Sequence, residues 1–259
     1  MTNNKNIPLV FADKTADVEK AEALAKHLGT SLVFEKPDEN GETVFLKADG
    51  DGISLAGKGL VLRADLTKMI PRIKNGRLQS ELLVKAAKIK GANRELTAID
   101  ATAGLGEDAL LLAASGFNVK LYEYDPVIAC LLRDSLERAS SVPELSEAVS
   151  RMELFEADSI SEMKKLTDSP DVILLDPMFP ERHKSALIKK KFQLLQQLES
   201  PCSDEKELLE AALCVRPRKV VIKRPVKGPY LADRKPDYSL SGKAVRYDCF
   251  VLTQLTTSN

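Results

Sequence analysis

The sequence has few of the residues that hold metal-dependent or disulfide-rich proteins together. Its 259 residues include only four cysteines and two histidines. The cysteines stand at positions 130, 202, 214 and 249, and no two of them have CxxC spacing. This spacing argues against a structural zinc site and against a disulfide framework. Because free thiols are typical of a reducing cytosol, we expect a cytoplasmic protein without a metal.

Long apolar runs and an excess of one charge are also missing. No apolar stretch approaches the roughly 18 residues that can cross a membrane, and the N-terminus lacks a basic segment followed by an apolar run. We therefore expect neither membrane association nor a secretory signal. The 38 basic residues balance 38 acidic ones, so a surface that binds nucleic acid must come from local clusters of charge.

Residues 1–62 alternate short apolar segments with turns that contain proline or glycine. The strand candidates are residues 7–11, 31–35, 43–47 and 52–55. Residues 15–28 carry apolar side chains at helical spacing, and Gly29 ends this predicted helix. We predict a small α+β domain over residues 1–62, followed by a basic linker and a helix over residues 63–95.

From residue 96 onward, β-rich segments alternate with helical ones. The strand candidates are residues 97–102, 118–124, 151–157, 171–176, 219–223 and 246–253, and the main helix candidates are 107–115, 126–140 and about 184–214. Asp125 before Pro126 predicts a helix N-cap. The alternation indicates an α/β fold with a mostly parallel sheet and helices on both faces. The last two strand candidates are too close for a helix, which predicts an antiparallel hairpin at the sheet edge.

The sharpest local feature is the glycine turn at residues 100–109 (DATAGLGEDA), where a strand ends, the chain turns and a helix begins. Gly104 and Gly106 can adopt positive φ and let a ligand approach the backbone. The turn suits the pyrophosphate of a dinucleotide at the helix N-terminus. It also suits S-adenosylmethionine (SAM), which carries a cationic sulfonium and an ammonium. The glycine spacing alone does not separate these ligands.

Carboxylates around the turn favour the cationic ligand. Asp100 stands at the strand end, and Glu107 and Asp108 open the helix, so a pyrophosphate would be repelled and an ammonium attracted. The alternative is that Glu107 and Asp108 only complement the helix dipole. Acids also end the next two strands. Glu123 is placed to bind ribose hydroxyls, and Asp158 either bonds the adenine amine or belongs to a simple turn.

Residues 171–180 (DVILLDPMFP) run from an apolar strand directly into an acid, a proline and an aromatic. Because ligands bind at the carboxyl ends of parallel strands, this corner should face the same crevice as the glycine turn. An exocyclic base amine is a poor nucleophile because its lone pair is delocalised into the ring. The Asp176 carboxylate or the Pro177 carbonyl can accept its N–H protons, and Phe179 can stack on an extruded base. The alternative is a proline-rich strand terminator.

Basic residues cluster at 181–191 and again at 216–235, where eight basic residues accompany one acid. Both stretches flank predicted strand ends and suit phosphate contacts, unless they are solvated helix faces. We expect Lys184, Lys223 and Arg224 to bind RNA, together with Arg77 from the segment before the core.

Four motifs together resemble one enzyme family. Residues 100–109, 122–126 (YEYDP), 176–187 (DPMFP followed by KSAL) and 221–225 (VIKRP) are similar to motifs of the ribosomal RNA small subunit methyltransferase J family. The resemblance covers about residues 60–259. It implies a class I SAM methyltransferase domain over residues 96–259, with a doubly wound, Rossmann-like sheet and a C-terminal antiparallel hairpin. It also implies methyl transfer from SAM to the N2 amine of a guanine in 16S ribosomal RNA, free or within the small ribosomal subunit.

The resemblance also implies which residues bind the cofactor, namely Glu107, Asp108, Glu123, Tyr124, Asp158, Ser159 and Asp176. Glu107 and Tyr124 stand where the family often has arginine. Asp100, Gly104 and Gly106 complete the expected cofactor site, and Asp176, Pro177 and Phe179 form the expected catalytic group. Two alternatives are an NAD(P)-dependent oxidoreductase on the same architecture and a non-catalytic RNA-binding module.

Overall fold

The computed structural model describes residues 7–74, 76–91, 93–177, 194 and 205–252. The chain divides into two compact units. Within the described residues, the first contains residues 7–65 and 125–138, and the second contains residues 66–124, 139–177 and 205–252. Within the described ranges, no helix is long and apolar enough to cross a membrane.

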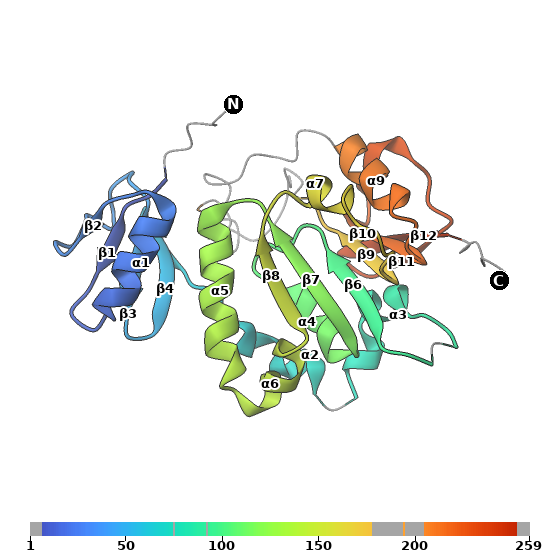
Figure 1. Ribbon diagram of the computed structural model, residues 1–259, viewed down its shortest axis with the longest axis horizontal. Helices are drawn as coiled ribbons and strands as arrows, with labels where there is room; N and C mark the ends of the chain where they lie inside the picture. The colour runs from blue at the N-terminus through green and yellow to red at the C-terminus, as the bar shows by residue number, and fades with distance from the viewer. Residues whose placement is uncertain (1–6, 75, 92, 178–193, 195–204, 253–259) are drawn as a thin grey trace. The chain divides into compact units, whose positions relative to one another are not determined.

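A five-stranded sheet forms the base of the first unit (Figure 1). The strand order is β2 (Leu32–Val33), β1 (Val10–Ala12), β3 (Phe45–Asp49), β4 (Gly52–Gly57) and β5 (Leu60–Leu62). Strand β1 is parallel to both neighbours, and the other pairs are antiparallel. Helix α1 (Val18–Leu28) ends at Gly29, whose φ of 63° is left-handed as the predicted stop requires. The predicted strands and helix are confirmed, whereas β5 was missed.

Helix α5 (Pro126–Ser140) contributes to the same unit. The Asp125 carboxylate accepts hydrogen bonds from the backbone N–H groups of Val127 and Ile128 at 2.9 and 3.2 Å, which confirms the predicted N-cap. Toward the other end of the helix, Arg138 donates a 2.6 Å hydrogen bond to the carbonyl of Ala64. The helix is therefore tied at its C-terminal end to the chain that follows β5.

The second unit is built on a seven-stranded sheet. Its order is β11 (Tyr238–Ser241), β12 (Val245–Val251), β10 (Lys219–Pro225), β9 (Val172–Leu175), β6 (Leu96–Asp100), β7 (Phe117–Glu123) and β8 (Met152–Glu156). Strands β10, β9, β6, β7 and β8 are parallel, and β12 is antiparallel to both of its neighbours. The chain runs outward through β6, β7 and β8 and then returns to β9 on the other side of β6. Ligands bind at such a switch point in doubly wound sheets.

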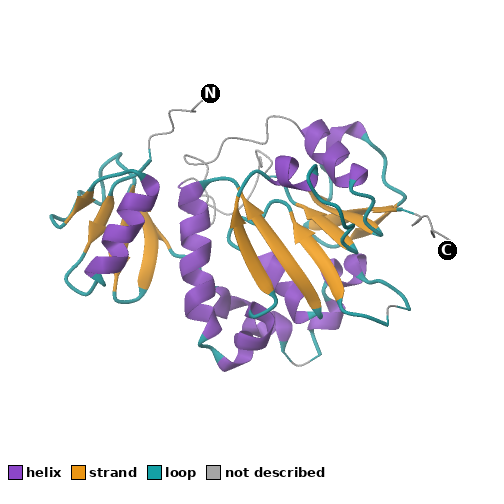
Figure 2. Cartoon of the chain, viewed as in Figure 1, coloured by secondary structure: helices purple, strands orange, loops and turns teal. Residues whose placement is uncertain are grey.

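Helices cover both faces of this sheet (Figure 2). Helices α7 (Ser159–Met163) and α9 (Glu205–Cys214) pack on one face over a cluster that includes Ile99, Ile173 and Ile222. The other helices of this unit within the described residues are α2 (Ile70–Ile73), α3 (Leu82–Ala87), α4 (Glu107–Ala114) and α6 (Pro143–Val149), with short 3₁₀ turns at Leu66–Met69, Leu78–Ser80 and Leu231–Asp233. Strand β9 and the last three residues of β6 are buried, so the carboxyl ends of these strands are held rigidly.

The predicted alternation is confirmed, and so is the doubly wound α/β fold. The hairpin of β10 and β12 is antiparallel as predicted, but it does not lie at the edge of the sheet, because β11 pairs with the outer side of β12. Strand β11 and helix α6 were missed. The predicted helix over residues 184–214 is described only from residue 205, so its first part lies outside the described residues. The proposed domain limits at residues 62 and 95 stay a prediction.

Candidate functional site

The glycine turn connects β6 to α4 in the conformation that its two glycines permit. Gly104 and Gly106 have φ of 53° and 79°, both in the left-handed region. The backbone N–H of Gly104 donates a 2.9 Å hydrogen bond to the carboxylate of Glu123 at the end of β7. The turn and the second strand end are therefore joined directly, as their positions at the same sheet edge predict.

Asp100, the last residue of β6, is buried under the turn with only 2% of its surface exposed. Its carboxylate accepts a 3.1 Å hydrogen bond from the N–H of Thr102. Burial raises the pKa of Asp100 to about 7, and the nearby carboxylates of Asp108 and Asp176 add to this, while the hydrogen bond opposes it. Asp100 therefore titrates near neutral pH and would gain from a cationic neighbour.

The other predicted cofactor residues lie at the ends of β7 and β8. Tyr124 follows Glu123 and is 68% exposed. The Asp158 carboxylate caps α7, accepting hydrogen bonds from the N–H groups of Ile160 and Ser161 and from the Ser161 hydroxyl. Ser159 is the first, buried residue of that helix. Asp158 thus has a structural task, and its contact with a cofactor stays a prediction.

The corner after β9 lies beside the glycine turn. Leu174 and Asp100 are neighbours in the register of β9 and β6, and the N–H of Asp176 donates a 2.7 Å hydrogen bond to the hydroxyl of Thr102. Asp176 keeps 38% of its side chain exposed, and Pro177 is buried. The structure therefore brings the glycine turn together with Asp176 and Pro177 at the carboxyl ends of the parallel strands. Phe179 lies outside the described residues.

A lysine connects the two segments. The Nζ of Lys223, near the end of β10, lies 2.6 Å from a carboxylate oxygen of Asp108 and 2.9 Å from one of Asp176. We call this arrangement the lysine bridge. Burial disfavours the charged lysine, but the two carboxylates outweigh it and hold the pKa of Lys223 well above its usual range. Lys223 therefore stays cationic at physiological pH.

Sequence reasoning missed the lysine bridge and two residues next to it, Thr102 and Tyr247. Thr102 was taken only as part of the turn, although its hydroxyl and N–H bond Asp176 and Asp100. Tyr247 on β12 pairs in register with Lys223 and is 3% exposed. Its pKa is raised above the usual range, chiefly by burial and then by Asp108. The signal available in the sequence was position, because Lys223 lies near the end of a strand candidate, as Asp176 does.

The residues predicted to bind RNA have different surroundings. Lys223 belongs to the lysine bridge. Arg224 is 1% exposed, and its Nε donates to the carbonyl of Pro229, so its guanidinium is not presented at the surface for a phosphate. Arg77 is exposed. Lys184 lies outside the described residues.

A hollow lies at the opposite end of the parallel strands. Its volume is about 660 Å³, and its lining includes Thr97 of β6, Asn118 of β7, Arg151 and residues 166–170. These residues stand where β6, β7 and β8 begin, away from the glycine turn. The hollow therefore does not belong to the site at the switch point.

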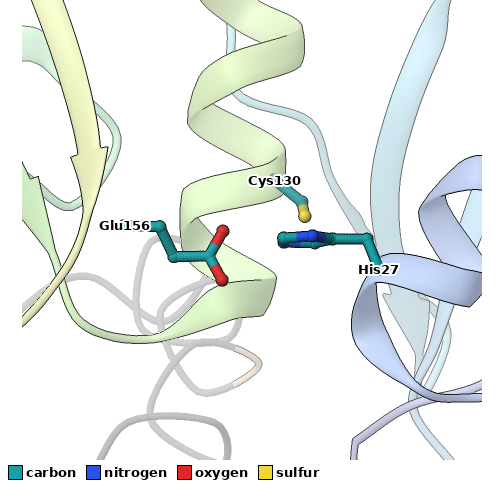
Figure 3. Close-up of side chains that lie close together, drawn as sticks. All are labelled: His27, Cys130 and Glu156. Carbon is teal, nitrogen blue, oxygen red and sulfur yellow. The ribbon is translucent and has the colours of Figure 1, made fainter.

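In the first unit, His27 at the end of α1 and Cys130 on α5 point toward one another (Figure 3). Their potential ligand atoms lie within 4.8 Å of each other. The Cys130 thiol also accepts a 3.9 Å contact from Arg133. Glu156, also labelled in the figure, belongs to the second unit. Two ligands fall short of the four that a structural zinc site needs, so this pair defines no metal centre.

The chemistry of the switch-point site fits SAM. Its carboxyl groups come from Asp100, Asp108, Glu123 and Asp176, and among the residues that the structure describes Lys223 forms ion pairs with two of them. This excess of acid suits the ammonium and sulfonium of SAM and would repel a pyrophosphate. The left-handed glycines leave the turn open, because a Cβ at Gly104 would meet only one atom, 4.0 Å away. Fold and site together define a class I SAM-dependent methyltransferase.

Comparison with known proteins agrees with this class. A family model of SAM-dependent methyltransferases (SAM_MT) matches residues 43–252. The ribosomal RNA small subunit methyltransferase J of Thioalkalivibrio sulfidiphilus is 41% identical and that of Nitrosococcus oceani 39%. The alignments cover 90% and 95% of this chain, and 93% and 99% of those proteins. The chain belongs to the ribosomal RNA small subunit methyltransferase J family.

A solved structure shows the same fold. The crystal structure of a SAM-dependent methyltransferase from Neisseria gonorrhoeae superposes with a TM-score of 0.74 at 29% identity, covering 97% of both chains. SAM is therefore the cofactor of this protein. The alternative reading as a nicotinamide-dependent oxidoreductase is not favoured.

Proposed function

We propose that this protein transfers a methyl group from SAM to the exocyclic N2 amine of a guanine in small-subunit ribosomal RNA. The names of its relatives support ribosomal RNA as the substrate. The adjacency of Asp176 and Pro177 to the glycine turn carries the proposal, because it puts a hydrogen-bond acceptor for an amine next to the cofactor site. We expect the methylation to take place in the cytoplasm, on free RNA or on the small ribosomal subunit.

The proposed catalytic work of the protein is orientation of the amine. The half-exposed Asp176 carboxylate accepts a hydrogen bond from an N–H of the base, which draws the nitrogen lone pair out of conjugation with the ring. Pro177 has no N–H to compete for that acceptor, and its ring fixes the backbone at the corner. When bound, SAM supplies an electrophilic methyl group on its sulfonium. Transfer of the methyl group would leave the cofactor as S-adenosylhomocysteine and the base nitrogen as a cation, whose acidic proton is lost without a strong base.

Positioning supplies much of the proposed rate enhancement. Asp176 is anchored on its backbone side by Thr102 and on its carboxylate side by Lys223. Strand β9 behind it is fully buried. The acceptor is thus held on the rigid part of the sheet, while stacking by Phe179 on the extruded base stays a prediction.

A preorganised loop after β10 is the proposed RNA contact. Arg246 on β12 is buried, pairs with Asp248, and donates hydrogen bonds of 2.8–3.3 Å to four carbonyls of residues 225–229. The loop presents Lys227 and Tyr230 to solvent, and Tyr230 is 39% exposed. The Arg246 guanidinium lies 5.0 Å from the Tyr230 ring and supports one face of it. A fixed aromatic beside a lysine suits a base and its phosphate.

The proposed function is tested by mass spectrometry of ribosomal RNA nucleosides from cells that lack the protein. We expect N2-methylguanosine to be lost at one position of the small-subunit RNA and restored by the wild-type gene. Purified protein is then given either free 16S RNA or small subunits from the deletion strain, which separates the two substrates. An unchanged nucleoside profile in the deletion strain contradicts the proposal.

A further inference from the structure

We propose that Lys223 is a positioning residue, which holds Asp108 on the cofactor side and Asp176 on the base side in one fixed arrangement. The inference rests on the proposed function for the identity of the base side. It replaces the phosphate contact that the sequence predicts for this lysine. A lysine that contacts a phosphate would instead affect only the KM for RNA.

The geometry of the bridge supports this role. Asp108 opens α4 directly after the glycine turn, and Asp176 directly follows β9. The Nζ of Lys223 contacts both carboxylates within 3 Å, and Asp108 is more buried than Asp176, with 14% against 38% of the side chain exposed. Lys223 itself is 27% exposed. One cation therefore fixes the first turn of the cofactor-binding helix to the acceptor at the catalytic corner.

The surrounding charges make a cation necessary at this point. Besides Asp108 on α4 and Asp176, the neighbours of Lys223 are Asp100 at the end of β6 and Tyr247 on β12. Arg72 on α2 acts on Asp108 and Tyr247, although Glu81 holds its guanidinium through two hydrogen bonds. Arg224, next to Lys223 on β10, acts on Asp176, but neither arginine forms an ion pair with both carboxylates as Lys223 does. Without Lys223, the two carboxylates would repel one another, and one of them would take up a proton or turn away. A protonated or displaced Asp176 no longer accepts a hydrogen bond from the amine.

Lys219 on the same strand is a matched comparison. Its Nζ donates to the carbonyls of Ala86 and Lys88, at 3.0 and 2.7 Å, at the other end of β10. It contacts no carboxylate among the described residues, so its removal affects packing and not the charge balance of the site. The Lys219→Met variant therefore controls for the loss of a partly buried lysine from this strand.

The experiment measures single-turnover methylation of unmethylated small subunits between pH 6 and 9. We expect Lys223→Met to lower the rate about 100-fold at pH 7. We also expect the acidic limb of its profile to move to higher pH, with partial recovery as the carboxylates ionise. Lys223→Arg keeps the charge and should keep the wild-type limb, and Lys219→Met should stay within about twofold of the wild-type rate.

A second readout needs no RNA. Calorimetry with S-adenosylhomocysteine in two buffers of different ionisation enthalpy counts the protons released on binding. At pH 7 we expect Lys223→Met to release more protons than the wild type, because the ligand ammonium favours the ionised carboxylate. Equal proton release, an unmoved acidic limb, or a rise only in the KM for RNA overturns the inference. A wild-type protein that methylates no RNA overturns the proposed function instead, and the calorimetry still decides about Lys223.

Discussion

Strand β9 has an aspartate at each end, and the two carboxylates have different surroundings. Asp171, before the strand, is fully buried and binds Arg94 through two hydrogen bonds and the N–H of Thr97 through a third. Arg218 lies 3.6 Å away. Asp176, after the strand, shares one lysine with another acid and keeps 38% of its side chain exposed. Among the described residues, the beginning of the strand therefore brings two arginines to one buried aspartate, whereas at its end one lysine is shared by two aspartates.

The comparison follows from the physics of parallel sheets. Where the strands end, the glycine turn and the corner open toward a ligand, and charge left unbalanced there can be used for binding and catalysis. Where the strands begin, an unbalanced buried charge only costs stability, so Asp171 is paired with arginine. Variants at the two ends should therefore separate activity from stability.

The largest effect is expected from Asp176→Ala. The substitution removes the acceptor for the amine, and we expect the methylation rate to fall at least about 1,000-fold, equivalent to about 4 kcal/mol. The Tm should change little, since the side chain is partly exposed. A single-turnover assay with thermal unfolding as the control checks both parts. A variant that methylates at the wild-type rate contradicts the assignment of the site.

Asp171→Ala should show the opposite behaviour. It leaves the N–H of Thr97 without its acceptor and Arg94 without its bidentate partner, so we expect the free energy of unfolding to fall by about 3 kcal/mol. The folded fraction should keep a wild-type rate at low temperature, with a wild-type affinity for S-adenosylhomocysteine. Urea unfolding measures the first effect. A loss of rate larger than that of Asp176→Ala would break the distinction between the two ends.

Asp100→Asn should change how stability depends on pH. In the folded protein the pKa of Asp100 is raised to about 7 from an ordinary value of 3.8, so the folded state binds a proton that the unfolded state has lost. This group therefore lowers the free energy of unfolding as the pH rises through that window, by about 3 kcal/mol between pH 5 and 8.

The test compares urea unfolding of wild type and Asp100→Asn at pH 5, 6, 7 and 8. The asparagine variant should show the flatter curve and gain relative stability at pH 8. Parallel curves for the two proteins would show that Asp100 is ionised throughout and would remove it from the argument.

The smallest effect is expected at the proposed RNA contact. Tyr230→Ala should raise the KM for RNA about tenfold through the loss of one stacked base, and Tyr230→Phe should retain most of the affinity. Tyr238→Ala is the matched control, because Tyr238 on β11 is 38% exposed but lies on the edge strand. The affinity for S-adenosylhomocysteine should stay unchanged in all three variants. Equal effects of the two alanine substitutions would remove the loop from the proposal.

Much of the fold was predictable because its signals are local. Apolar runs such as 172–175 and the glycine turn mark strands and their ends, and Asp125 before Pro126 marks a helix start. Strand β11 was missed because most of its side chains are exposed and its pairing with β12 is made across a loop. Its sequence, YSLS, has no apolar pattern to separate it from that loop.

The sequence predicts which acids and glycines form the candidate site, but it does not predict the ion pairs that connect them. That Asp100, Glu123 and Asp176 meet at one edge follows from the ends of parallel strands. The lysine bridge does not, because Lys223 is 115 residues from Asp108 and looks like one more basic residue in a basic stretch. Lys223 and Arg224 are largely buried and bind protein groups, whereas Arg77 is exposed. A pattern of charges in the sequence does not show which basic residues are buried.

A crystal structure of the complex with S-adenosylhomocysteine tests the central claim most directly. The account predicts that the ligand lies at the switch point, with its ammonium near Asp100 and Asp108, its ribose at Glu123 and its sulfur on the side of Asp176. A ligand seated instead in the hollow formed by Thr97, Asn118 and Arg151, or a sulfur turned away from Asp176, would contradict it.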